Sequence, residues 1–561
     1  MNKCSCYIID LLYELGVREA YGVPGGVILP FLYALASSKK IKPHLSYHEQ
    51  QACYSAMGYA QANNTVGLAF CTKGPGVTNM VTAIADAYFD SVPVIVVTAH
   101  TTYKKMGTRC DLDQELNTKQ LFTNICKAVF IIDTVTNINE VLYKAIQTSV
   151  NGRKGPVVLD VETSLFDVLI PNEFQNFNDN EYTNCIDIID LIYSQIEASS
   201  RPLILLGDGI KQSNMTNRTR QLIEKLALPV VSSRYSIDVY KGKYYFGYIG
   251  SHGIRYANYL LEKSDLIISL GNRLSFPVDS ASYSFMKEKK IIRMDIDSSE
   301  FYRQCGKAIN LCCDLNKLVS EFVKISKKIN KKNNWMEYCF HVKKVLFNFD
   351  LNEATDAVEK ILNRIPLNSK IVCDVGNNEF WVSRAYVRGK NTYPIYFSKS
   401  FGVLGNSLPK SIGVSSTCDF TVCFTGDQGF QFNLSSLEAI GHEKLPILIF
   451  IFNNKSSGMI KSREYSKYGN NFIHVNYESG YANPEFSQIA KAYSIRYMSY
   501  EEYIGSYDSK CLLPMIVEIE IDEGIGLEPS LKRNDSMINM IPYLPYEIKK
   551  GLDKYEENKL L

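Results

Sequence analysis

The stretch GDQGFQFNLSSLEAIGHEKLPILIFIFNN, residues 426–454, decides the fold that the sequence predicts. The apolar run at 421–424 is typical of a buried strand, and the run at 445–452 is typical of a second one. Between them, residues 434–440 carry apolar side chains at helical spacing. This strand-helix-strand order predicts two parallel strands whose carboxyl ends meet at one edge of a sheet.

Oxygen-bearing side chains follow both strands at this edge. Asp427 comes after the first strand and Asn454 after the second, so we expect them to converge where open α/β sheets bind their ligands. A carboxylate, an amide oxygen and a nearby backbone carbonyl suit a magnesium ion that shares its shell with phosphates. An ordinary unit in which Asp427 caps a helix and Asn454 completes a turn explains this stretch equally well.

Size and composition limit the classes of protein. A chain of 561 residues exceeds one core and predicts about three domains. The net charge of +2 gives no electrostatic reason to bind nucleic acid or an anionic membrane. The longest apolar runs have strand length, and the first residues lack the pattern of a secretion signal. Fifteen scattered cysteines without CxxC pairs are typical of reduced thiols, so we expect a cytoplasmic protein.

Two polar stretches, at 171–184 and 326–334, are predicted linkers. In each of the three blocks that these linkers separate, buried-strand patterns alternate with helical ones. This alternation predicts an α/β protein with doubly wound parallel sheets. Five of the predicted strands lie at 66–70, 92–97, 203–206, 266–270 and 370–373. The predicted domains cover 1–170, 186–325 and 345–540, followed by a C-terminal tail at 541–561.

Four motifs of the first domain occur in a fixed order. They are YGVPGGV at 21–27, HEQQA at 48–52, TKGPGVTN at 72–79 and AYFDSVPV at 87–94. Glycine turns allow close backbone approach to a ligand, but they also occur in ordinary loops. Glu49 opens a predicted helix, where an acidic side chain is often only a solvated partner of the helix dipole. The small residues that follow at 56–60 predict a closely packed helix.

The order of these motifs resembles the pyrimidine-binding domain of acetolactate synthase. The GD…NN pattern of the opening stretch resembles the thiamine diphosphate fingerprint shared by acetolactate synthase, pyruvate oxidase and pyruvate decarboxylase. The resemblance implies that Glu49 hydrogen-bonds the aminopyrimidine of thiamine diphosphate and favours its imino tautomer, which takes the proton from the thiazolium carbon. It also implies that Asp427, Asn454 and the carbonyl of Ser456 hold Mg²⁺.

The same resemblance extends to the third domain. Residues 374–381 would meet the diphosphate, and residues 400–409 would hold the aminopyrimidine. There Gly402 would offer a carbonyl, and Leu404 would donate its amide and support the bent cofactor with its side chain. The implied catalytic set is Glu49, Gln114 and Gly26. The implied cofactor contacts are Glu49, Pro24, Asn79, Gly376, Asn377, Asn378, Gly402, Leu404, Gly426, Asp427, Gln428, Gly429, Asn454 and Met459.

Four positions depart from the acetolactate synthase pattern. Gln428 stands where the family has a second glycine, and Asp113 replaces a phenylalanine that faces the reacting carbon. Pro277 falls where the family has an arginine that helps to bind flavin and substrate. Arg463 replaces a tryptophan that selects the acceptor, and its guanidinium suits a carboxylate or phosphate, although a solvated surface arginine fits equally well.

The resemblance implies an acetolactate-synthase-like carboligase. It would decarboxylate a 2-ketoacid, pyruvate in the simplest case, and transfer the two-carbon unit to a carbonyl acceptor, for example a nucleotide keto-sugar. The alternatives are a 2-ketoacid decarboxylase that releases an aldehyde and a cofactor-binding homologue without turnover. The family implies a homodimer or homotetramer, and it is compatible with a regulatory subunit and with FAD in the central domain.

Overall fold

The computed structural model describes residues 2–101, 114–171, 185–275, 286, 288–302, 306–325, 329, 333–506, 513–532 and 535–560. The chain divides into two compact units, each assembled from separate segments. Unit 1 comprises residues 1–179, 364–379 and 393–523, and unit 2 comprises residues 180–363, 380–392 and 524–561.

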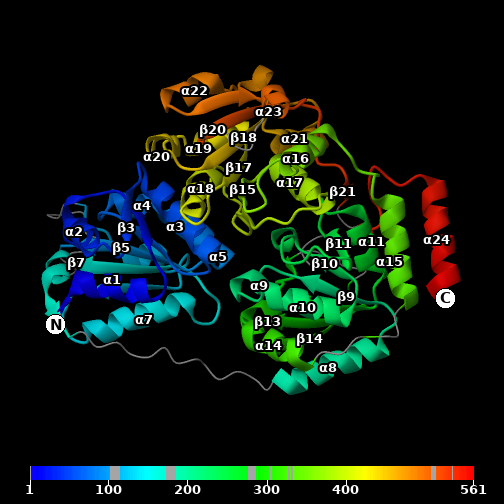
Figure 1. The fold of residues 1–561 in the computed structure, drawn as a ribbon, viewed down its shortest axis with the longest axis horizontal. Helices are drawn as coiled ribbons and strands as arrows, with labels where there is room; N and C mark the ends of the chain where they lie inside the picture. Colours follow the sequence, from blue (N-terminus) through cyan, green and yellow to red (C-terminus); the bar gives the residue numbers. More distant parts are fainter. Residues whose placement is uncertain are drawn as a thin grey trace. The chain divides into compact units, whose positions relative to one another are not determined.

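Unit 1 contains two six-stranded parallel sheets of the same topology (Figure 1). The N-terminal sheet has the order β3-β2-β4-β5-β7-β6, and the C-terminal sheet has the order β16-β15-β17-β18-β20-β19. Numbered within each sheet, both orders are 2-1-3-4-6-5, so the two halves of the unit repeat one architecture. The strands are β2 (Glu19–Gly22), β3 (Lys42–Leu45), β4 (Gly67–Phe70), β5 (Val94–His100), β6 (Ala128–Ile132), β7 (Val157–Glu162), β15 (Lys370–Cys373), β16 (Ile395–Phe397), β17 (Thr421–Gly426), β18 (Ile447–Asn453), β19 (Arg496–Ser499) and β20 (Met515–Glu520).

Two helices join these halves. Helix α3 (Glu49–Asn63) lies beside α18 (Ser407–Ser415), and both contribute to one apolar core (Figure 1). The helices cross closely, because a Cβ at Gly413 would lie 1.8 Å from the carbonyl oxygen of Ser55. The other helices of this part are α1 (Cys4–Glu14), α2 (Leu29–Ser38), α4 (Pro75–Asn79), α5 (Val81–Asp90), α6 (Thr118–Phe122), α7 (Ile138–Val150), α17 (Asn377–Arg388, divided between the units after Glu379), α19 (Asp427–Phe432), α20 (Ser436–His442), α21 (Gly458–Tyr468), α22 (Phe486–Ala492) and α23 (Tyr500–Ser506).

Unit 2 is built on a third six-stranded parallel sheet, of order β11-β10-β9-β12-β13-β14. Numbered within the sheet this order is 3-2-1-4-5-6, the doubly wound arrangement of dinucleotide-binding folds. Its strands are β9 (Pro202–Leu206), β10 (Val230–Ser232), β11 (Tyr245–Tyr248), β12 (Leu266–Leu270), β13 (Lys290–Asp295) and β14 (Lys307–Cys312). Its helices are α8 (Cys185–Ala198), α9 (Gly209–Gln212), α10 (Thr216–Leu226), α11 (Arg255–Lys263), α14 (Leu315–Ile325), α15 (Asn333–Leu346), α16 (Glu353–Leu362) and α24 (Tyr546–Leu560).

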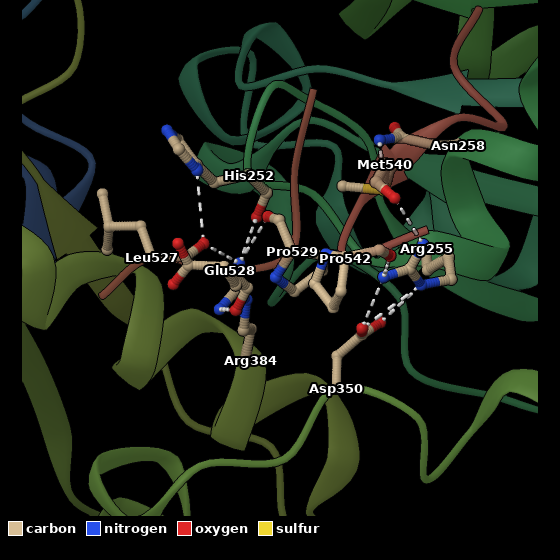
Figure 2. A network of polar contacts seen from close by, with 10 residues as sticks. All are labelled: His252, Arg255, Asn258, Asp350, Arg384, Leu527, Glu528, Pro529, Met540 and Pro542. Carbon is tan, nitrogen blue, oxygen red and sulfur yellow. Dashed lines mark hydrogen bonds and ion pairs between the residues drawn. The ribbon is translucent and has the colours of Figure 1, made fainter. Parts of the chain in front are cut away.

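The C-terminal segment of the chain is bound into unit 2 by two buried arginines (Figure 2). Arg384 donates to the carbonyl oxygens of Leu527 at 2.7 Å and Pro529 at 3.0 Å. Arg255 donates to the carbonyl oxygen of Met540 at 3.0 Å and forms an ion pair with Asp350 at 2.8 Å. The segment then ends in α24, which packs along α15 (Figure 1). The stretch that the sequence predicted only as a tail is therefore largely helical.

The structure confirms the predicted α/β class, with three parallel sheets and interleaved helices. Strands β12 and β15 have the predicted bounds, and β17 and β18 are parallel neighbours in which Gly426 pairs with Phe452. Most residues of the two predicted linkers lie outside the described part of the chain. Among the described residues, no helix is both long and apolar enough to cross a lipid bilayer.

Candidate active site

Glu49 is a buried carboxylate at the first position of α3. Its side chain is 8% exposed, and its Oε2 accepts a hydrogen bond from Asn79 Nδ2 at 2.8 Å. A Cβ at Gly76 would approach Glu49 Oε1 to 3.3 Å, so the glycine leaves room beside this second oxygen. The N-terminal end of the helix favours a negative charge at this position. The structure thus brings Glu49 and Asn79, two predicted site residues, into direct contact.

The glycine turns of the N-terminal half lie together. A Cβ at Gly25 would lie 2.4 Å from Thr72 Cβ, so the turn that holds Pro24 and Gly26 packs against the turn that begins at Thr72. Nothing lies within 4 Å of the Cβ position of Gly26, which leaves open space there. Gln114 adopts a left-handed φ of 60°, and its carbonyl oxygen lies 2.7 Å from the Cβ position of Gly74. Gln114 therefore borders the same group of turns.

Asp427 lies at the carboxyl edge of the C-terminal sheet and begins the short helix α19. The sequence predicted the helix of this stretch at 434–440, whereas the structure already begins a short helix directly after β17. Asp427 is 3% exposed, and its Oδ1 accepts the backbone N–H of Gln428 at 2.8 Å. Burial raises the pKa of Asp427, while hydrogen bonds from Asn483, Tyr481 and the backbone of Gln428 and Ser456 oppose that rise.

Asn483 connects the ends of β17 and β18. Its Nδ2 donates to Asp427 Oδ2 at 2.8 Å and to Asn453 Oδ1 at 2.9 Å. Asn453 Nδ2 donates in turn to Glu518 Oε1 at 2.6 Å, and Glu518 Oε2 accepts from Tyr497 at 2.5 Å. The sequence analysis missed Asn483, because it lies in a loop far from both strands in the chain. This network fixes the orientation of the Asp427 carboxylate.

The groups around Asp427 fit a metal ion bound with a diphosphate. Asn377 Nδ2 and Asn454 Nδ2 each lie 2.8 Å from the Cβ position of Gly458, so a side chain at position 458 would collide with both amides. The segments that carry these three residues therefore meet at this point. Asn377 Oδ1 is buried without a hydrogen-bond partner. Among the described residues, no three His, Cys, Asp or Glu side chains form a metal site. A single carboxylate with amide and carbonyl oxygens is instead the kind of set that Mg²⁺ shares with phosphates.

Gln428 and Ser456 complete this edge. Gln428 Oε1 accepts a hydrogen bond from Ser457 Oγ at 3.0 Å, so the side chain that replaces the expected glycine is held by the turn after β18. Ser456 is 3% exposed, and its hydroxyl donates to the carbonyl oxygen of Val475 at 2.9 Å. The side chain of Ser456 is therefore engaged, and only its backbone is available to a ligand.

The loop at 398–407 is held by a second buried aspartate that the sequence analysis did not single out. Asp374 follows β15 and is fully buried. Its carboxylate accepts from Gly405 N at 3.0 Å, Ser407 Oγ at 2.8 Å and Thr425 Oγ1 at 3.2 Å. Asp374 therefore fixes this loop to the ends of β15 and β17. The signal in the sequence was a carboxylate directly after a buried strand, the same as for Asp427.

The predicted contacts in this loop are accessible. Gly402 is exposed with a φ of 69°, and nothing lies within 4 Å of its Cβ position. Leu404 is half-buried, whereas Val403 packs against the apolar core. Beside this loop, Gly376 has a φ of 128°, and its Cβ position lies 2.8 Å from Asn378 Oδ1. Gly429 has a packing role of its own, because its Cβ position lies 3.1 Å from Asp374 Oδ2.

Helix α21 follows the predicted metal ligands and has no buried residue. Met459 is half-buried, and Arg463 is exposed. The positions of Met459 and Arg463 agree with their predicted roles, which stay predictions. The two other departures from the family pattern, Asp113 and Pro277, lie outside the described residues.

The glycines of the central sheet have a structural explanation that needs no ligand. A Cβ at Gly207 would lie 2.1 Å from the carbonyl oxygen of Gly271, and one at Gly209 would lie 2.9 Å from the Cα of Gly271. These turns follow β9 and β12, the neighbouring strands at which the order of the sheet reverses. The glycines thus allow two turns to touch, and FAD at this sheet stays a prediction.

Known protein domains match three successive parts of the chain. Residues 2–121 match the N-terminal TPP binding domain of thiamine pyrophosphate enzymes, residues 189–322 match their central domain, and residues 374–510 match their C-terminal TPP binding domain. The chain is 30% identical over 529 residues to a probable acetolactate synthase large subunit of Methanococcus aeolicus, covering 88% of this chain and 87% of the relative. It is 29% identical to the acetolactate synthase large subunit of Cyanidium caldarium (87% of each chain) and 28% identical to that of Lactococcus lactis (96% and 94%).

The buried Glu49, the oxygen-rich edge at Asp427 and these matches agree, and the chain belongs to the thiamine pyrophosphate enzymes, in which thiamine pyrophosphate is thiamine diphosphate. Within that family it is an acetolactate-synthase-like, thiamine diphosphate-dependent enzyme of the transferase type.

Proposed function

We propose that this protein decarboxylates a 2-ketoacid, pyruvate in the simplest case, and transfers the resulting two-carbon unit to a carbonyl acceptor, with thiamine diphosphate and Mg²⁺ as cofactors. The observation that carries the proposal is the contact between Glu49 and Asn79. Glu49 is a buried carboxylate in which one oxygen accepts a hydrogen bond from Asn79 and the other lies beside Gly76. This pair occurs in a chain that matches all three domains of thiamine pyrophosphate enzymes.

The residues at the C-terminal sheet would bind the phosphorylated end of the cofactor. Asp427, Asn454 and the carbonyl of Ser456 would hold Mg²⁺, and Asn483 keeps the Asp427 carboxylate oriented. Asn377 would offer its buried unbonded oxygen to the metal, and its amide nitrogen would donate to the diphosphate. When bound, the thiazolium ring supplies the electron sink for loss of carbon dioxide.

The residues at the N-terminal sheet would control a proton. Glu49 is buried, and it would exchange a proton with the aminopyrimidine of the bound cofactor in each cycle. Asn79 orients the other oxygen. Gly26 and Gln114, both exposed in this chain, would contact the 2-ketoacid beside the glycine turns.

Three further features belong to the proposal. The protein would work as a homodimer or homotetramer, in which Glu49 of one subunit and Asp427 of another share one cofactor. A regulatory subunit is compatible with the similarity to large subunits. Arg463, exposed on α21, would favour an anionic or phosphorylated acceptor. The colour of the purified protein tests FAD, because bound flavin is yellow.

The test is to incubate the full-length protein with pyruvate, thiamine diphosphate and Mg²⁺ and to measure carbon dioxide and products with and without added carbonyl acceptors. A carboligation product supports the proposal, acetaldehyde alone supports a decarboxylase, and no carbon dioxide supports a cofactor-binding homologue. Glu49→Gln should abolish carbon dioxide release. The matched control is Glu140→Gln, which makes the same change at an exposed glutamate in the first turn of α7. Normal turnover in Glu49→Gln would refute the assignment.

A further inference from the structure

A buried carboxylate on α5 holds the beginning of the loop at 398–407. Asp90 is 4% exposed and is the last residue of that helix. Its Oδ2 accepts the backbone N–H of Lys399 at 2.9 Å, and its Oδ1 accepts the backbone N–H of Ser400 at 2.8 Å. Both oxygens of one side chain from the N-terminal half therefore fix two consecutive peptide groups of the C-terminal half.

A second carboxylate of α5 closes the same loop. Ser398 Oγ donates to Asp86 Oδ1 at 2.9 Å and accepts the backbone N–H of Val403 at 3.2 Å. The hydroxyl of Ser398 thus links Asp86 to the far side of the loop. Phe401 at the tip stacks on Phe89 of α5, with ring centroids 5.3 Å apart.

A buried lysine partly offsets the charges of these aspartates. Lys410 on α18 is fully buried, and its Nζ donates to the carbonyl oxygen of Phe397 at 3.2 Å. Burial raises the pKa of Asp86 to about 7, and the positive charge of Lys410 opposes this rise. Burial also raises the pKa of Asp90, against the charges of Lys399 and Lys410. Two carboxylates and one ammonium group are thus enclosed between the halves of unit 1.

The loop is therefore anchored at both ends. Asp374 holds Gly405 and Ser407 at the far end. Between the anchors, Gly402 is exposed and Leu404 is half-buried. A carboxylate that accepts two consecutive N–H groups defines the position of a peptide more strictly than apolar packing does.

We propose that Asp90 is a positioning residue for the cofactor: by fixing Lys399 and Ser400 it sets the place of Gly402 and Leu404, against which the aminopyrimidine of thiamine diphosphate would rest. The inference rests on the proposed function, because it needs the chain to bind this cofactor. It concerns only the pyrimidine end of the ligand, since the diphosphate end would be held at Asp427 and Asn454.

The chain offers a matched control for Asp90. In unit 2, Asp265 accepts the backbone N–H of Ser200 at 2.8 Å with Oδ2 and that of Arg201 at 2.9 Å with Oδ1, which also accepts from the hydroxyl of Ser199. Changing either aspartate to asparagine replaces one acceptor oxygen with an amide that faces a peptide N–H. Both changes should lower the unfolding temperature, but only Asp90 lies at the loop.

The experiment measures the affinity of the full-length protein for thiamine diphosphate and for inorganic diphosphate, both with Mg²⁺, by calorimetric titration. Asp90→Asn should weaken thiamine diphosphate by ~10- to 100-fold, the range expected for losing a charge-assisted hydrogen bond. It should leave inorganic diphosphate unchanged, and Asp265→Asn should leave both affinities unchanged. Ser398→Ala, which removes the hydroxyl link between Asp86 and the backbone of Val403, should give the same pattern with a smaller loss, and it replaces Asp90→Asn if that variant does not fold.

The outcomes separate the two proposals. Equal affinity of Asp90→Asn and the wild type for thiamine diphosphate would overturn the positioning role. Loss of both ligands in Asp90→Asn would also overturn it, because a general disruption does not distinguish the two ends of the cofactor. A wild-type protein that binds inorganic diphosphate as tightly as thiamine diphosphate would instead refute the proposed function.

Discussion

Replacing Asn483 with alanine tests whether the Asp427 carboxylate must be oriented to bind Mg²⁺. The change removes the hydrogen bonds from one Nδ2 to Asp427 Oδ2 and Asn453 Oδ1, at 2.8 and 2.9 Å. Asp427 keeps its bond from the backbone of Gln428 at 2.8 Å, so the carboxylate stays in place but can rotate.

The size of the effect follows from these bonds. A hydrogen bond to a charged group contributes about 1.5–3 kcal/mol, which corresponds to roughly a 10- to 150-fold change in an equilibrium constant. Partners that orient metal ligands have comparable effects, about 10- to 100-fold on metal affinity. We therefore expect Asn483→Ala to weaken Mg²⁺ binding by ~10- to 100-fold at a fixed, saturating concentration of thiamine diphosphate.

The assay is a Mg²⁺ titration of the metal-depleted protein, followed by the change in intrinsic fluorescence or by calorimetry. Asn471→Ala is the matched control, because Asn471 is an exposed asparagine in the same part of the chain whose amide donates only to the carbonyl oxygen of Tyr468. A Mg²⁺ affinity in Asn483→Ala within about twofold of the control, below any hydrogen-bond contribution, would show that the Asn483 bonds do not prepare a metal site.

His44 should make stability depend on pH. Burial lowers the pKa of His44, but hydrogen bonds to Glu19 and Glu443 outweigh burial and raise this pKa from 6.5 to about 9. The protonated imidazole therefore stabilises the folded state fully below pH 6.5, and this stabilisation is lost as the pH rises through 9. A shift of this size corresponds to about 3 kcal/mol, or roughly 5 °C for a unit of this length, and thermal scans should show it in the wild type but not in His44→Gln. Gly413→Ala should destabilise by several kcal/mol because its Cβ would meet the Ser55 carbonyl, whereas Gly551→Ala, with open space around it, should be neutral or slightly stabilising in the same scans. Arg463→Gln should raise KM for an anionic acceptor by about tenfold without changing carbon dioxide release from pyruvate; equal KM values for charged and uncharged acceptors in the wild type would remove this role.

The strands of the sheets were predictable because they are buried on both faces. A parallel strand such as β12 or β15 is a continuous apolar run with polar residues at each end, and this pattern predicts its bounds. The meeting of Asp427 with the end of β18 followed from the same rule, since parallel neighbours end together. The helix α19 was missed because glycines at 426 and 429 are typical of a turn, whereas in the structure Gly429 permits close packing against Asp374 and Thr425.

The residues that hold the site in place were not predictable from local pattern. Asp90 and Asp86 lie on a helix, where acidic side chains are usually solvated, and their partners are about 310 positions away in the chain. Lys410 lies on a helix that the small residues of α3 bury completely. Only the folded structure pairs these charges. The contact of Glu49 with Asn79 agrees with their motifs, but the role of Glu49 stays a prediction. Asp113 and Pro277 lie outside the described residues.

The C-terminal segment that Arg255 and Arg384 bind joins unit 2 only late in synthesis. Unit 2 is assembled from residues 180–363, 380–392 and 524–561, so Arg255 and Arg384 acquire their carbonyl partners only when the last residues have left the ribosome. Until then the guanidinium groups lack these carbonyl partners, and their burial is incompletely compensated. A stop codon before residue 524 would therefore disable a unit that begins at residue 180.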